Sequence, residues 1–182
     1  MLSFVFNPFP VIQTERLVLR KISHSDTESL FAMRSDPSTM RFIPRPVARH
    51  HDDVTELIQR ILSELNENRS INWAITLKED NILIGTIGYV RMSPENHRGE
   101  VGYMLSQHHY GKGIMNEALT AVIDYGFNKL NLHSIEGVVS PENMASSNVL
   151  KKCGFIREAY YKEKEYVNGK FEDIEVYSLI KS

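Results

Sequence analysis

The sequence predicts a mixed α/β fold whose central sheet is mostly antiparallel. Alternating apolar residues indicate several short strands in series, a strand–helix–strand crossover follows them, and the chain ends in two strands joined by an Asn-Gly turn. A length of 182 residues with 42% hydrophobic side chains is typical of one globular domain. We therefore expect residues 1–182 to form a single domain that begins with an ordered arm over residues 1–13.

In the first half of the chain, the pattern predicts one strand, two helices and a meander of three strands. The expected elements are a strand over residues 14–22, a helix over 23–36, a helix over 54–65, and strands over 71–80, 82–92 and 98–106. The helix at 54–65 carries its apolar residues at spacings of three and four, which places them on one buried face. Glu79, Asp80 and Asn81 form a polar turn between the first two strands of the meander.

The second half predicts a crossover, a short helix and a terminal hairpin. A helical stripe from Leu119 to Leu130 precedes a strand over 133–140, a helix over 143–155 that Gly154 stops, and strands over 155–167 and 170–180. Asn168 and Gly169 stand between these last two strands, which is a strong hairpin signal.

Composition excludes several classes of protein. A formal net charge of -2 gives no general attraction to nucleic acid or to an anionic membrane. The N-terminal stretch has no basic start and contains Pro8 and Pro10, and it is too short to span a bilayer. Cys153 is the single cysteine, so an intramolecular disulfide is impossible. These features predict a cytoplasmic protein. We expect no metal site, since no HExxH motif or cysteine cluster occurs.

The stretch MLSQHHYGKGIMNEAL places Gly111 and Gly113 where the long helix begins. Glycine lets a ligand approach the backbone, and the first amides of a helix have no intrahelical partner, which together suit a phosphate. A surface turn would also explain a lone G-x-G. A P-loop is excluded by the spacing, and a dinucleotide fingerprint would need a third glycine where Asn116 stands.

The motifs EVGYML, HHYGKGIMNEAL and NMASSNVLKKCGF, in this order of elements, resemble the GCN5-related N-acetyltransferase (GNAT) superfamily. The opening TERLVLR and the ending VNGKFEDIEVYSL are similar to its RimJ/RimL-like subgroup of ribosomal-protein N-acetyltransferases, and the resemblance runs from about Thr14 to the C-terminus. It implies a sheet in which two parallel strands splay apart, helices on both faces, and acetyl-CoA as cosubstrate without a metal.

The resemblance also implies where acetyl-CoA binds. Its pyrophosphate would lie on the loop and helix start, and its pantetheine arm would contact the preceding strand and the start of the last helix. The implied residues are Met104, Leu105, His109, Tyr110, Gly111, Lys112, Gly113, Ile114, Met115 and Asn143. His108 stands where the family pattern has Gln or Arg. Two alternatives remain open: Lys112 as a solvated surface lysine, and Asn143 with Ser146 as ordinary helix-capping residues.

Acetyl transfer to an amine requires an uncharged amine and a stabilised thiolate leaving group. Glu100 matches the acidic residue that often acts as a base through water in related enzymes, and its competing interpretation is a surface carboxylate paired with Arg98. Glu136 is a second, weaker candidate. Leu150 stands where many members have a tyrosine acid, so Ser146 is expected to stabilise the thiolate by a hydrogen bond.

We therefore expect an acetyl-CoA-dependent N-acetyltransferase that acts by direct attack of a primary amine. The subgroup resemblance favours a protein N-terminus, such as that of a ribosomal protein, as the acceptor. The alternatives are an acetyltransferase for a small amine (a polyamine, an aminoglycoside or an amino acid) and a non-catalytic CoA-binding module. A peptide needs an open groove between the front helices and the terminal hairpin, whereas a small amine needs a closed acidic pocket. The hairpin is also a candidate for pairing across a homodimer.

Overall fold

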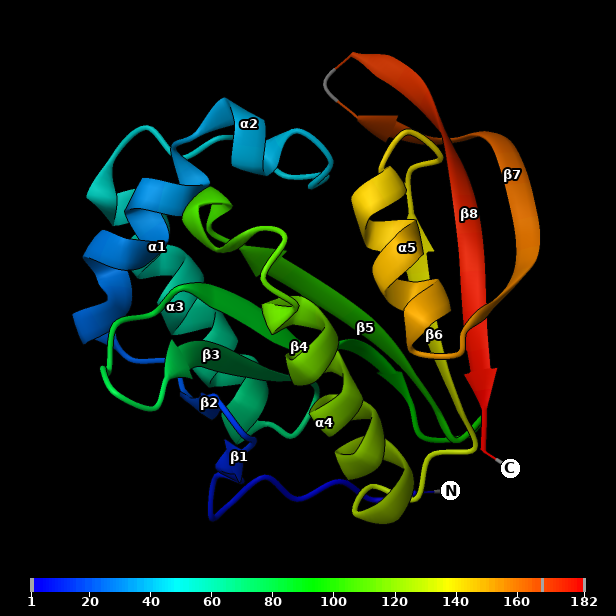
Figure 1. Ribbon diagram of the computed structural model, residues 1–182, viewed down its shortest axis with the longest axis horizontal. Coiled ribbons are helices and arrows are strands. Elements are labelled where there is room, and N and C mark those ends of the chain that lie inside the picture. The colour runs from blue at the N-terminus through cyan, green and yellow to red at the C-terminus, as the bar shows by residue number, and fades with distance from the viewer. Residues whose placement is uncertain (1, 168, 182) are drawn as a thin grey trace.

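The computed structural model describes residues 2–167 and 169–181, and its centre is one twisted sheet (Figure 1). The order of the strands is β1-β2-β3-β4-β5-β6-β8-β7, and among the strands of these described residues only β5 and β6 pair in parallel. The strands are β1 Ile12–Gln13, β2 Leu17–Lys21, β3 Ile71–Leu77, β4 Gly85–Ser93, β5 Arg98–Leu105, β6 Ser134–Val139, β7 Ile156–Val167 and β8 Lys170–Ile180. The mixed and mostly antiparallel sheet predicted from the sequence is thus confirmed, while the turn residue Asn168 lies outside the described residues.

Helices cover both faces of this sheet (Figure 1). They are α1 Thr27–Arg34, α2 Pro37–Met40, α3 His51–Asn66, α4 Ile114–Asn128 and α5 Met144–Lys152, with short 3-10 turns at His24–Asp26 and Gln107–His109. On one face, α1 and α3 pack against Ile22, Ala74 and Met104. On the other face, α4 and α5 pack against Ile87 and Val101. None of the described helices has the length and apolar character to span a membrane.

Two short elements and two boundaries differ from the sequence prediction. The strand expected from residue 82 begins only at Gly85. The helix expected from residue 54 begins at His51, because Asp53 in its polar first turn accepts hydrogen bonds from the amides of Arg49 and His50. Neither the two-residue β1 nor the four-residue α2 was expected. Pro37 and the cap by Asp36 define α2, and four residues are too few to show a helical period.

The N-terminal arm packs against the core. Phe4 and Phe6 are buried in the same cluster as the residues of α4. The indole Nε1 of Trp73 donates a hydrogen bond of 2.7 Å to the carbonyl oxygen of Pro10. The arm is therefore ordered by apolar burial and by a buried donor that it satisfies.

The parallel strands β5 and β6 separate after a short stretch of pairing. Their register runs from Arg98 with Ser134 to Glu100 with Glu136 and goes no further. Beyond this point β5 continues in its pairing with β4, while β6 continues with β8. The gap between the two strands opens toward the start of α4, which positions the functional site.

Candidate active site

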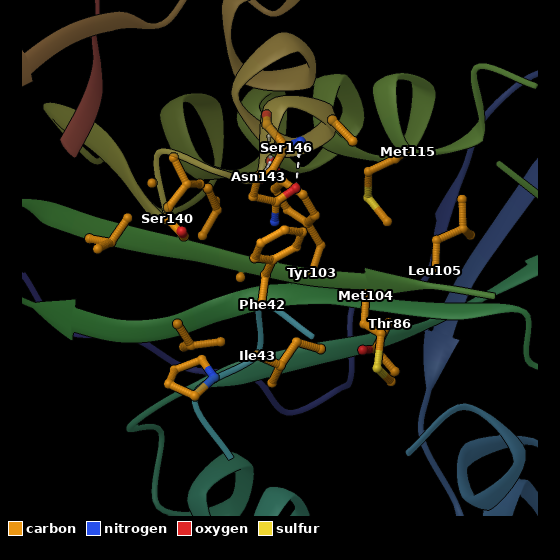
Figure 2. Close-up of a pocket in the computed structure, with 18 of the residues that line it drawn as sticks. Phe42, Ile43, Thr86, Tyr103, Met104, Leu105, Met115, Ser140, Asn143 and Ser146 are labelled. Atoms are coloured by element: carbon orange, nitrogen blue, oxygen red, sulfur yellow. Dashed lines mark hydrogen bonds between the residues drawn. The ribbon is translucent and has the colours of Figure 1, made fainter. Parts of the chain in front are cut away.

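A cleft of about 1280 Å³ lies where β5 and β6 separate. Figure 2 shows Met104 and Leu105 on β5, Ser140, Asn143 and Ser146 across the gap, and Phe42 and Ile43 on the wall that follows α2. Most of the residues that sequence analysis assigned to the site line this cleft: Glu100, Met104, Leu105, His109, Tyr110, Gly111, Gly113, Ile114, Met115, Asn143 and Ser146. Lys112 is exposed and is not among the residues that line the cleft, which agrees with the alternative of a solvated side chain.

The loop before α4 presents its backbone to the cleft. Gly111 and Gly113 have φ of 72° and 74°, a left-handed conformation that favours glycine. Within the described chain, the amides of residues 111–116 have no hydrogen-bond acceptor, and the amide of Glu117 is the first to bond back, to Gly113 at 3.1 Å. A Cβ atom built on Gly111 would meet no other atom within 4 Å. The loop is therefore an open cradle of amide donors that fits the phosphates of acetyl-CoA.

A carboxylate in the first turn of α4 fixes this cradle. Glu117 accepts hydrogen bonds from the Thr14 hydroxyl at 2.5 Å and from the Arg16 amide at 2.8 Å, and it forms an ion pair with the Arg16 guanidinium at 2.6 Å. The same guanidinium donates to the carbonyl oxygen of Lys112 at 2.9 Å. Lys112 thus contributes its backbone to the anchored loop while its side chain is solvated.

Besides the unpaired amides, the loop has an unpaired side-chain nitrogen, on His109. Its Nδ1 atom is the one buried side-chain nitrogen or oxygen without a hydrogen-bond partner among residues 2–167 and 169–181. Burial, followed by the charges of Lys112 and His108, lowers the pKa of the imidazole. A neutral ring with an unpartnered nitrogen beside the amide cradle fits a ligand that supplies a polar group there.

The last helix brings a hydroxyl pair to the cleft. The Asn143 side chain caps α5 by accepting a hydrogen bond from the Ser146 amide at 3.1 Å, as expected if the two are helix-capping residues. The Tyr103 hydroxyl lies 2.8 Å from Ser146 Oγ (Figure 2). Burial raises the pKa of Tyr103 to about 12, so this phenol stays protonated. Sequence analysis missed Tyr103, although its position beside Met104 in EVGYML marked it as facing the opposite side of β5.

Glu100 lies at the end of the parallel pairing, and only 14% of its side chain is exposed. Its carboxylate pairs with Arg91 at 3.0 Å and not with Arg98, which instead pairs with Glu136 at 3.4 Å. The expected alternative of a Glu100–Arg98 pair is therefore wrong. Burial raises the pKa of Glu100 despite Arg91, and nearby Glu136 and Glu165 add to the increase. Glu136 itself does not line the cleft.

The charged groups of the cleft include no metal-binding cluster. Among the described residues, no three His, Cys, Asp or Glu side chains are grouped to hold a metal ion. The arrangement combines an amide cradle, a hydroxyl pair and a carboxylate with a raised pKa around one gap in the sheet. Such a set can bind a phosphorylated cosubstrate and move a proton beside it.

A family model described as an acetyltransferase (GNAT) domain matches residues 16–156. The chain belongs to the GNAT acetyltransferase family. It is 34% identical to the uncharacterized N-acetyltransferase YoaA of Bacillus subtilis over 95% of this chain and 98% of that protein. It is 35% identical to the ribosomal-protein-serine acetyltransferase of Escherichia coli over 57% of each chain. The spermidine N(1)-acetyltransferase of Vibrio cholerae is 23% identical over 92% of this chain and 94% of that protein.

Solved structures give the same family. A GNAT acetyltransferase from Bacillus anthracis superimposes with a TM-score of 0.85 and 29% identity, over 94% of this chain and 98% of that one. These similarities confirm the fold class, the RimJ/RimL-like resemblance and an acetyl-CoA-dependent N-acetyltransferase activity. They disfavour the non-catalytic CoA-binding module.

Proposed function

We propose that this acetyltransferase modifies the α-amine of a protein N-terminus, with ribosomal proteins as the first candidates. The observation that carries the proposal is the extent of the cleft, which runs from α3 and the segment after α2 to the terminal hairpin. The cleft of about 1280 Å³ has to hold acetyl-CoA as well as the acceptor, so its reach along the molecule, rather than its volume, favours an extended peptide. The E. coli relative named for ribosomal-protein-serine acetylation supports the same acceptor class.

In this proposal the acetyl-CoA pyrophosphate binds the amides of residues 111–115, which include those of Ile114 and Met115. The amides of His109 and Tyr110, which the resemblance also implied, already donate to the carbonyl oxygens of Ser106 and Gln107. The unpaired amides and the positive end of the α4 dipole favour an anion at this position without a lysine side chain. The pantetheine arm then runs along Met104 and Leu105 to Asn143. The bound cosubstrate supplies an acetyl thioester, and the residues of the chain orient it toward the acceptor.

Glu100 acts as the base through water. The pKa of an α-amine is about 8 and that of lysine about 10.4, so deprotonation near neutral pH costs about 1.4 and about 5 kcal/mol respectively. A carboxylate is a weak base, and this difference favours the α-amine as acceptor. Glu165 and Glu172 also line the cleft, directly opposite each other on β7 and β8. Two like charges in this register repel each other, and an incoming ammonium relieves the repulsion.

The departing thiolate is stabilised by Ser146 with Tyr103 behind it. Their oxygens lie 2.8 Å apart, so the Ser146 hydroxyl can donate a hydrogen bond to the sulfur while the Tyr103 hydroxyl donates one to Ser146 Oγ. Leu150, at the usual tyrosine position, has a hydrocarbon side chain with no proton to donate, and it is buried in the core.

Calorimetric titration with acetyl-CoA tests the cosubstrate site. We expect micromolar affinity, about -8 kcal/mol, in the wild-type protein and none in Gly111→Asp, which puts a negative charge in the cradle. Gly169→Asp is the matched control, because Gly169 also has a positive φ and open space at its Cβ but lies outside the cleft. Equal binding by wild-type protein and Gly111→Asp would contradict the cradle.

Acetylation of short N-terminal peptides, followed by mass spectrometry, tests the acceptor. We expect transfer to the α-amine and none to a lysine in the same peptide. A second candidate, a small polyamine, is favoured by the spermidine acetyltransferase relative and by the acidic pair on the hairpin. Turnover of spermidine without turnover of any peptide would replace the proposed acceptor by this one.

A further inference from the structure

Three arginines form a basic wall on the side of the cleft that α1, α3 and the segment after α2 provide. Arg34 ends α1, Arg45 lies in the segment after α2, and Arg60 lies on α3. All three line the cleft. They are close enough that the charges of Arg60 and Arg45 add to burial in lowering the pKa of Arg34. The charges of the other two arginines thus act on the partly buried Arg34, and an anion bound beside it would offset them.

Within the described chain, no carboxylate forms an ion pair with any member of the basic wall. Glu56 and Glu64 lie one turn before and after Arg60 on α3, and Glu64 instead accepts a hydrogen bond from the Ser70 hydroxyl at 2.9 Å.

Other acidic residues of the front segment have partners elsewhere. Asp36 caps α2 and accepts from Gln107, Asp53 accepts from two amides at the start of α3, and Glu28 pairs with His51. Arg41, which follows α2, already pairs with Glu142 across the cleft. Glu64 and Glu142 also line the cleft, but Glu64 accepts from Ser70 and Glu142 pairs with Arg41. Among the described residues the basic wall therefore has no ion-pair partner and can bind an added anion.

The wall lies on the same face of the sheet as the proposed base. Arg34 and Arg60 come from helices α1 and α3, which pack on the face of β5 that carries Met104. Glu100 is four residues before Met104 on this strand, so the period of two places it on that face as well. Tyr103 points to the opposite face, where it meets Ser146 of α5. The arginines thus belong to the acceptor side of the gap.

We propose that the acceptor carries an anionic group close to its amine and that Arg34, Arg45 and Arg60 bind this group. The acidic end of the cleft, at Glu100, Glu165 and Glu172, receives the amine. This inference rests on the proposed function, and there it means a protein whose first residues after the acetylated one include Asp or Glu. A polyamine, which carries only positive charge, is disfavoured by the same wall.

Matched peptides test the inference. One peptide is neutral, and the others carry Asp at the second, third or fourth position or Lys at the same positions. For the wild-type protein we expect kcat/KM to be about tenfold higher for the best acidic peptide than for the neutral one, since a charge-assisted hydrogen bond contributes on that scale. Lysine peptides are expected to fall below the neutral peptide.

Variants at the exposed Arg60 connect this preference with the wall. Arg60→Gln should reduce the acidic-to-neutral ratio toward one, and Arg60→Glu should shift the preference toward the lysine peptides. Arg49→Gln is the matched control, because Arg49 lies in the same front segment but does not line the cleft, and it should keep the wild-type ratio. A wild-type ratio near one, or a ratio that Arg60→Gln does not change, would overturn the inference. So would a loss of acetyl-CoA affinity in Arg60→Gln, which would assign the wall to the cosubstrate.

A pair of small acceptors separates this inference from the proposed function. Pentylamine and 5-aminovalerate differ only by a carboxylate at the far end of the chain. If no peptide is acetylated but 5-aminovalerate is strongly preferred over pentylamine, the protein acceptor is wrong and the anion site stands. If neutral and acidic peptides are acetylated equally, the protein acceptor stands and the anion site is wrong.

Discussion

At the residue scale, the environment of Glu100 decides whether a surface carboxylate can act as a base. The β-bulge between Tyr89 and Arg91 brings Arg91 opposite Glu100 in the register of β4 and β5. Arg98, two positions from Glu100 on the same strand, turns instead toward Glu136 on the parallel neighbour. Burial raises the pKa of Glu100 while Arg91 opposes the increase, so the carboxylate is more basic than an ordinary one and remains hydrogen-bonded.

The pH dependence of activity tests this assignment. We expect kcat/KM to fall as the pH drops through the raised pKa of Glu100, because the protonated acid cannot accept a proton. Arg91→Gln removes a charge that lowers this pKa, so the acidic limb should move to higher pH. Glu100→Gln should lower kcat by about 10²-fold or more while acetyl-CoA binding is retained.

Arg98→Gln is the control for these profiles, since Arg98 carries the same charge one pair away and contacts Glu136. Its acidic limb should stay close to that of the wild-type protein. If Glu100→Gln turns over peptides at the wild-type rate, Glu100 is not the base.

The proposed role of the Tyr103–Ser146 pair in stabilising the thiolate can be tested by removing each hydroxyl. Ser146→Ala removes the hydroxyl proposed to meet the sulfur, and Tyr103→Phe removes its partner with little change in shape. Both variants should lower kcat more than they raise KM for acetyl-CoA, because the hydrogen bond strengthens only as the thiolate forms. The double variant should lose little beyond the larger single effect. Fully additive losses would contradict a shared role.

At the element scale, periodicity predicts long elements and fails for short ones. The helix α4 and the terminal hairpin were predicted because each repeats its pattern over many residues, while β1 and α2 are held by caps and by tertiary contacts. The glycine loop of the site could likewise be predicted from its local signature. Phe42 and the basic wall could not, because they reach the cleft only when α1, α3 and the segment after α2 pack together over the sheet. Arg91 required the bulge, which no simple alternation reveals.

The close approach of α4 to β4 depends on Gly126. The Tyr89 hydroxyl donates to the Val122 carbonyl oxygen at 2.8 Å, and a methyl group at Gly126 would collide with that hydroxyl. We expect Gly126→Ala to lower the free energy of unfolding by about 1–3 kcal/mol, measured by urea denaturation. Asp124→Ala, on the exposed side of the same helix, should have a much smaller effect.

A second substitution checks the cause. Tyr89→Phe loses its hydrogen bond but also removes the oxygen that collides, so combining it with Gly126→Ala should cost less than the sum of the two single changes. An additive sum would show that the methyl group is accommodated in another way.

At the scale of the whole molecule, the splayed strands divide the sheet into two parts. Within the part of the chain that the structure describes, strand pairing joins β1 to β5 with β6 to β8 only over the short parallel stretch from Arg98 to Glu100. The helix α4 spans the junction, since its residues belong to the same apolar cluster as Ile87 of β4 and Ile135 of β6. One continuous core across the gap predicts that both parts unfold together.

Thermal unfolding with and without acetyl-CoA tests this coupling. We expect one cooperative transition that acetyl-CoA raises as a unit, because a ligand bound between β5 and the start of α5 stabilises only the state in which both parts are folded. At a hundredfold excess over Kd the stabilisation is about 2.7 kcal/mol, or roughly 5 to 10 °C for a domain of this size. Gly111→Asp should lose this shift and Gly169→Asp should keep it, whatever each does to the unliganded protein. Two separate transitions, of which acetyl-CoA moves one, would mean that the parts on either side of the gap are independent folding units and that the cosubstrate binds to only one of them.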